Sequence, residues 1–120
     1  MLNLDTHIVL HALTGDLTRR ERALLTGDSW SISAIVIWEI GKLAELDRIE
    51  IDLDDPELGR TLHRIHVWPL SLDICRAIRT LDVRSDPADE IIAATSMVHR
   101  APLVTRDRRL LSSRRVPLAR

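Results

Sequence analysis

Four acidic residues stand where they could bind a metal ion together. Asp5 follows a short apolar run, and Glu39 lies inside a longer one. Asp89 precedes an apolar run, and Asp107 comes shortly after another. A carboxylate is costly to bury without a partner, and carboxylates that converge also repel one another. A divalent cation relieves both costs, and Mg²⁺ and Mn²⁺ prefer oxygen ligands.

Such a site suits the hydrolysis of a phosphodiester bond. A bound metal polarises the phosphoryl oxygen, lowers the pKa of a bound water and stabilises the leaving oxygen. A carboxylate can orient the water, so no protein nucleophile is required. Zinc is disfavoured because the chain has a single cysteine, Cys75, and no Cys/His cluster with the spacing of zinc ligands.

Each acid also has an ordinary structural interpretation. Asp5 could simply cap a helix, Glu39 could face solvent, and Asp86 could cap the helix that follows it. Asp89 could interact with the positive end of that helix's dipole, and Asp107 could pair with a neighbouring arginine. The spacing alone therefore leaves both interpretations of these acids open.

Short apolar runs alternate with longer helical patterns, which predicts the elements that position these acids. Strands are predicted over residues 1–4, 29–32, 67–68 and 102–105, with a last edge strand over 116–118. Helices are predicted over 7–13, 18–26, 34–46, 56–63, 72–81 and 87–99, with a helical turn over 107–112. This alternation indicates an α/β fold with a parallel sheet and helices on both faces, and the functional cleft of such sheets lies at the carboxyl ends of the strands.

Length and composition fit one globular domain spanning residues 1–120. Hydrophobic residues make up 45% of the chain, which is ordinary for a folded protein. No apolar run approaches the ~20 residues of a membrane span, and the first residues do not resemble a signal peptide. A lone cysteine agrees with a reducing compartment. We therefore expect a cytoplasmic protein that does not associate with membranes.

Charge is distributed unevenly although the net charge is only −1. The C-terminal segment is rich in arginine, and a guanidinium group suits bidentate contacts with phosphate. Arg106, Arg108 and Arg109 are the candidates for RNA contacts, although a solvated arginine-rich tail would look the same. The only aromatic residues are three tryptophans, too few for base stacking to be the main mode of binding.

Three stretches resemble the motifs of PIN-domain ribonucleases, and specifically of VapC-type toxins of type II toxin–antitoxin systems. Residues 2–7 (Leu-Asn-Leu-Asp-Thr-His) resemble the opening strand and its metal-binding aspartate. Residues 33–40 resemble the second motif, in which Ser33 is followed six residues later by Glu39. Residues 86–95 together with 103–107 resemble the third and fourth acidic motifs. The resemblance covers nearly the whole chain in the right order.

This resemblance implies a three-layer α/β/α sandwich around a parallel sheet of four to five short strands. It implies an endoribonuclease with Mg²⁺ or Mn²⁺ held by Asp5, Glu39, Asp89 and Asp107. Asp86 would be an auxiliary acid, and Ser33 and Thr105 would form hydrogen bonds that orient the acids. It also implies an RNA substrate (tRNA, rRNA or mRNA), a homodimer, and inhibition by a cognate VapB-type antitoxin.

Three alternatives compete with this interpretation. A non-catalytic PIN-fold module could use the same cleft to bind a protein, although a degenerate domain tends to lose one of the acids. A receiver domain would need a lysine at the end of a late strand, whereas the only lysine is Lys42, on a predicted helix. A phosphatase of the haloacid-dehalogenase type would need a second aspartate at position 7, which is His7.

Overall fold

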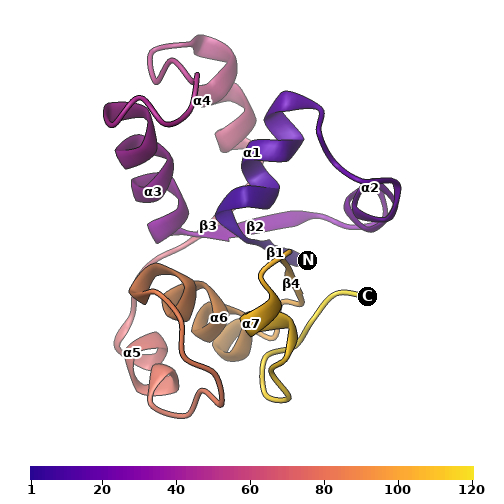
Figure 1. Ribbon diagram of the computed structural model, residues 1–120, viewed down its shortest axis with the longest axis vertical. Helices are drawn as coiled ribbons and strands as arrows, with labels where there is room; N and C mark the ends of the chain where they lie inside the picture. Colours follow the sequence, from indigo (N-terminus) through magenta and orange to yellow (C-terminus); the bar gives the residue numbers. More distant parts are fainter.

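Four parallel strands form the centre of the molecule in a computed structural model that describes residues 1–120 (Figure 1). The strands are β1 (Leu2–Leu4), β2 (Trp30–Ser33), β3 (His66–Trp68) and β4 (Leu103–Val104). They lie in the order β3-β2-β1-β4, and every neighbouring pair is parallel. The predicted α/β fold with a parallel sheet of four to five short strands is therefore confirmed.

Seven helices surround the sheet. The helices α1 (Thr6–Thr14), α3 (Ala34–Glu45) and α4 (Pro56–His63) lie on one side of it, and α5 (Leu72–Ile78), α6 (Pro87–His99) and α7 (Arg108–Leu111) lie on the other (Figure 1). Helix α2 (Arg19–Thr26) lies near the start of β2. Local signals mark the ends of the first two helices: Thr18 and Glu21 form a capping box for α2, and Gly15 ends α1 in the left-handed conformation that glycine adopts without strain.

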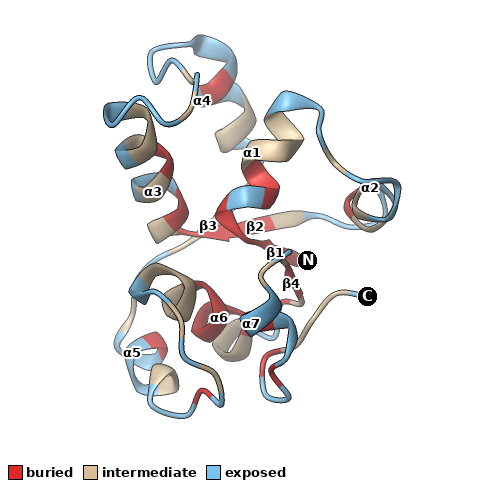
Figure 2. Ribbon diagram, viewed as in Figure 1, coloured by how far each residue is buried: buried red, intermediate tan, exposed pale blue.

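The core lies where the sheet meets α1, α3 and α6, and Figure 2 shows buried residues gathered on these elements. Leu4, Ile32 and Leu103 of the strands are almost completely buried, as are Ile8 of α1 and Ile92 of α6. Each such side chain contributes roughly 1.5–3 kcal/mol on burial. The strands that lead to the candidate acids are therefore held rigidly.

Two sequence predictions differ from the structure. The predicted edge strand over 116–118 is reduced to a single parallel bridge between Leu103 and Leu118, because β4 itself is only two residues long and Pro117 has no N–H to donate. The helix predicted over 72–81 ends at Ile78. No helix has both the length and the apolar character needed to cross a bilayer.

Candidate active site

The candidate acids gather at the carboxyl ends of β1 and β4. The chain runs from β1 to β2 and β3 on one side of the sheet, and then crosses back to β4 on the other side of β1. The connections diverge at this point, which is where open α/β sheets bind their ligands. Asp5 directly follows β1, and Asp107 stands at the cap of α7, three residues after β4.

Asp5 is a buried carboxylate whose two oxygens each accept a hydrogen bond. Only 2% of the residue is exposed. Its Oδ1 accepts a hydrogen bond from the backbone N of Thr6 (2.8 Å), and its Oδ2 accepts one from the hydroxyl of Thr105 (2.6 Å). Burial raises the pKa of Asp5, and these two hydrogen bonds partly oppose that effect. Asp5 therefore both caps α1 and places a carboxylate at the edge of the sheet.

Glu39 turns toward this edge from helix α3. Its side chain is partly buried, and its Oε1 accepts a hydrogen bond from the hydroxyl of Thr6, which is itself buried next to Asp5. The neighbouring Trp38, by contrast, is 60% exposed. The structure therefore disagrees with the simple solvent-facing interpretation of Glu39. Its carboxylate is linked to Asp5 through Thr6, which forms a hydrogen bond with each of the two acids.

Asp89 lies near enough to the other three acids for their charges to affect its pKa. It lies in the first turn of α6, where its Oδ2 accepts a hydrogen bond from the hydroxyl of Ser85 (2.9 Å). Burial is the largest of the effects that together raise the pKa of Asp89 to about 6; the negative charges of Asp5, Asp107 and Glu39 also raise it, and the hydrogen bond from Ser85 lowers it. Carboxylates affect one another's pKa in this way only when they lie close together.

Thr105 links two of the acids. Its hydroxyl donates to Asp5 and accepts a hydrogen bond from the backbone N of Asp107 (3.0 Å). The Oδ1 of Asp107 in turn accepts from the backbone N of Arg109 (2.8 Å) and so caps α7. Thr105 thus makes the acid-orienting hydrogen bond that the sequence resemblance implied.

Two predicted residues have different surroundings from those expected. The hydroxyl of Ser33 accepts a hydrogen bond from the backbone N of Ile35 (3.3 Å) and caps α3, and it bonds to none of the four acids. Asp86 stands at the cap position of α6, but its exposed carboxylate accepts no capping hydrogen bond. The preceding Ser85 donates hydrogen bonds to two acids of the first turn, Asp89 and Glu90. Asp86 is therefore the N-cap residue of α6, as predicted, but its side chain makes no capping hydrogen bond.

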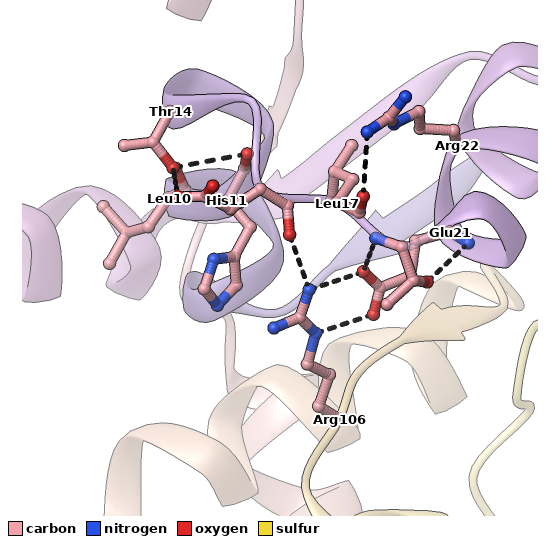
Figure 3. A network of polar contacts seen from close by, with 9 residues as sticks. Leu10, His11, Thr14, Leu17, Glu21, Arg22 and Arg106 are labelled. Carbon is pink, nitrogen blue, oxygen red and sulfur yellow. Dashed lines mark hydrogen bonds and ion pairs between the residues drawn. The ribbon is translucent and has the colours of Figure 1, made fainter.

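Arg106 forms an ion pair with Glu21 and a further hydrogen bond with Asp16. Its Nε and Nη2 donate to the two carboxylate oxygens of Glu21, each at 2.7 Å, and Nη2 also donates to the carbonyl of Asp16 (3.1 Å; Figure 3). The hydrogen bonds from Arg106 are the main reason that the pKa of Glu21 is lowered to about 2. Arg108 and Arg109 are exposed on α7 and form no ion pair.

The chemistry of the donor set fits a divalent cation, although no three acidic, His or Cys side chains lie close enough in this structure to enclose one. Every candidate ligand is a carboxylate oxygen, the kind that Mg²⁺ and Mn²⁺ prefer. Glu39, Asp89 and Asp107 each have one carboxylate oxygen without a hydrogen-bond partner. The negative charges of the other three acids also contribute, after burial, to the raised pKa of Asp89.

Three positioning residues were not identified from the sequence. Thr6 and Ser85 donate to Glu39 and Asp89. Asn3, buried within β1, donates to the carbonyl of Ile92 (3.1 Å) and to the hydroxyl of Ser96 (2.9 Å), which fixes α6 to the strand that leads to Asp5. The position of Asn3 between two leucines of a buried strand could have indicated its role, because a buried amide needs hydrogen-bond partners.

Comparison with known proteins agrees with this geometry. The family model of the PIN domain matches residues 3–115. Ribonuclease VapC22 of Mycobacterium tuberculosis is 31% identical over 97 residues, a match that covers 78% of this chain and 74% of that protein.

Solved structures share the fold. A toxin–antitoxin complex from Klebsiella pneumoniae has a chain with a TM-score of 0.71 and 21% identity, covering 93% of this chain and 91% of that chain. VapBC2 from Rickettsia felis, bound to a promoter DNA fragment, has a chain with a TM-score of 0.74 and 18% identity, covering 99% of this chain and 98% of that chain. The motifs, the fold and the family match agree: the chain belongs to the PIN-domain family, among its VapC-type members.

Proposed function

We propose that this chain is a metal-dependent endoribonuclease that acts in the cytoplasm as the toxin of a toxin–antitoxin pair. The observation that carries the proposal is a series of hydrogen bonds at one edge of the sheet, which joins Glu39 to Asp5 through Thr6 and Asp5 to Asp107 through Thr105. The charges of these three acids also contribute to the raised pKa of Asp89. The relative named as a ribonuclease supports RNA as the substrate. We also propose that residues 1–120 form a single nuclease domain.

Asp5, Glu39, Asp89 and Asp107 would together hold the ion. A bound Mg²⁺ or Mn²⁺ supplies Lewis-acid polarisation of the scissile phosphate and acidifies water. A carboxylate of this set would orient the attacking water. Asp86, exposed at the start of α6, remains a candidate auxiliary acid.

The neighbouring residues hold these acids in place. Thr105 fixes one oxygen of Asp5 and the backbone of Asp107, and Thr6 fixes one oxygen of Glu39. Such supporting hydrogen bonds orient metal ligands and are typically worth 10–100-fold in metal affinity or activity. The exposed Arg108 and Arg109 lie directly after Asp107 and would contact the phosphates of the RNA beside the site.

A cognate antitoxin is the proposed protein partner, because the structures with the same fold are described as toxin–antitoxin or VapBC complexes. A homodimer is proposed as well. Large apolar side chains are exposed on the surface, including Trp38 and Leu72, and burial in an assembly would remove this apolar area from water.

The test is cleavage of total RNA by the purified protein with Mg²⁺, with Mn²⁺ and with EDTA. The proposal predicts cleavage that requires a divalent metal and disappears with EDTA. A folded protein that cuts no RNA with either metal would contradict it and favour the alternative, a non-catalytic PIN-fold module that binds a protein in the same cleft.

A further inference from the structure

We propose that Arg106 is a positioning residue for the active site and does not bind RNA. Through its ion pair with Glu21, Arg106 fastens the segment between β4 and α7 to helix α2. That segment carries Thr105 and Asp107, so the ion pair sets the positions of two groups at the edge of the sheet. This inference rests on the proposed nuclease function, because it assigns a role within that site.

The contact is strong and directional. The planar guanidinium of Arg106 meets both carboxylate oxygens of Glu21 at 2.7 Å, and it also donates to the Asp16 carbonyl at 3.1 Å. A two-pronged pair of this kind fixes orientation as well as distance. The Glu21 side chain is only 12% exposed and that of Arg106 38%, so water competes little at the glutamate end.

The residues that accept hydrogen bonds from Arg106 are themselves fixed by the ends of helices α1 and α2 (Figure 3). Glu21 belongs to the capping box of α2: its Oε1 accepts from the backbone N of Thr18 (2.9 Å), and its backbone N donates to the Thr18 hydroxyl (3.1 Å). Asp16 directly follows Gly15, whose left-handed conformation (φ 80°) ends α1. Glu21 therefore lies in the first turn of α2, and Asp16 lies in the connection between α1 and α2.

The side that Arg106 holds has little structure of its own. Residues 105–107 form neither strand nor helix, β4 before them has two residues, and α7 after them has four. Thr105 bonds to Asp5, and the backbone N of Asp107 bonds back to Thr105. The only side-chain ion pair in this segment is that of Arg106, so it adds a second long-range restraint beside the hydrogen bond from Thr105 to Asp5.

The same contact argues against a role in RNA binding. The charge of Arg106 is already neutralised by Glu21, and a phosphate would have to displace both carboxylate oxygens to bind it. Arg108 and Arg109 have no such partner. The sequence-based assignment of Arg106 as an RNA contact is therefore replaced by a positioning role.

The variants Glu21→Gln and Arg106→Gln, alone and combined, separate the two roles. Glutamine at position 21 retains an oxygen for the capping box but loses the paired carboxylate. We expect each single variant to lower kcat on RNA roughly 10–100-fold, with KM changed less than about twofold, and the double variant to be no worse than the singles. Glu57→Gln, which breaks the exposed pair with Arg60 on α4, is the matched control and should cleave like the wild type.

An RNA contact would give the opposite pattern. Arg106→Gln would then raise KM, while Glu21→Gln would free the guanidinium and leave KM unchanged or lower it. That result, or additive effects of the two substitutions, would overturn the inference.

Amide hydrogen exchange gives a readout that does not depend on activity. We expect faster exchange at residues 105–110 in both single variants and no change there in Glu57→Gln. Unchanged exchange in the single variants would refute the restraint. A wild-type protein that does not cleave RNA would refute the proposed function instead, and the exchange experiment would still decide whether the ion pair restrains the segment.

Discussion

Replacing Asp89 with asparagine should stabilise the metal-free protein at neutral and alkaline pH. Burial and the charges of three other carboxylates raise the pKa of Asp89 from its ordinary value of 3.8 to about 6. The folded protein therefore binds this proton more tightly than the unfolded chain does. Stability is lost as the pH rises from about 3.8 through about 6, and the full cost of the ionised carboxylate is present above that range.

The size of the effect follows from the difference in pKa. One pKa unit corresponds to about 1.4 kcal/mol, so the shift sets an upper limit of about 3 kcal/mol. The side chain is only partly buried and water screens its charge, so we expect a gain of about 1–2 kcal/mol at pH 8. Asparagine retains an oxygen for the hydrogen bond from Ser85, so the substitution removes charge without leaving that hydroxyl unpaired.

The assay is urea unfolding in EDTA at pH 8 and pH 5, compared with Asp54→Asn, which removes an exposed acid that forms no ion pair. The gain for Asp89→Asn should fall by about half at pH 5, and the control should show no comparable gain at either pH. Added Mn²⁺ should stabilise the wild type more than the variant, because a ligand that binds the folded state raises its stability. A variant that is less stable than the wild type at pH 8 would refute the convergence of the acids.

Three further predictions address the surrounding residues. Thr105→Val removes two hydrogen bonds and should cost about 1–2 kcal/mol in urea unfolding and roughly 10–100-fold in kcat. Arg106→Gln should cost about 1 kcal/mol at pH 7, discounted because the arginine is 38% exposed. The pKa of Glu21 is lowered from 4.5 to about 2, so the stabilisation by this ion pair is present above pH 4.5 and is lost as the pH falls through about 2. The destabilisation caused by Arg106→Gln should therefore be smaller in unfolding measurements at pH 3 than at pH 7. The double substitution of Arg108 and Arg109 by glutamine should raise KM for RNA and weaken its salt dependence while leaving kcat largely unchanged; an unaltered KM would exclude the phosphate contact.

The sequence predicted most elements because their boundaries have local causes. Ser33 and Ser71 cap helices that begin where the pattern indicated, and Gly15 ends the first helix. Ligands bind at the carboxyl ends of parallel strands, and this rule predicted that Asp5 and Asp107 lie at the same edge of the sheet. These predictions needed only residues that are neighbours in the chain and the alternation of strands with helices.

The contacts that were not predicted join residues far apart in the chain. The pair of Arg106 with Glu21 spans 85 positions, and the bond from Thr6 to Glu39 spans 33. Neither sequence spacing nor periodicity indicates which arginine meets which acid, so Arg106 looked like a candidate phosphate contact. The same limit explains why a hydrogen bond to an acid was expected of Ser33 and is made by Thr6.

Diffraction from crystals soaked in Mn²⁺, with data collected at the manganese absorption edge, tests the central claim most directly. We predict an anomalous peak at the carboxyl ends of β1 and β4, within roughly 2–2.5 Å of carboxylate oxygens from Asp5 and at least one of Glu39, Asp89 and Asp107. The peak should be absent from crystals of Asp5→Asn. A manganese ion bound only elsewhere, or none at saturating concentration, would contradict the assignment of these four acids as a metal site.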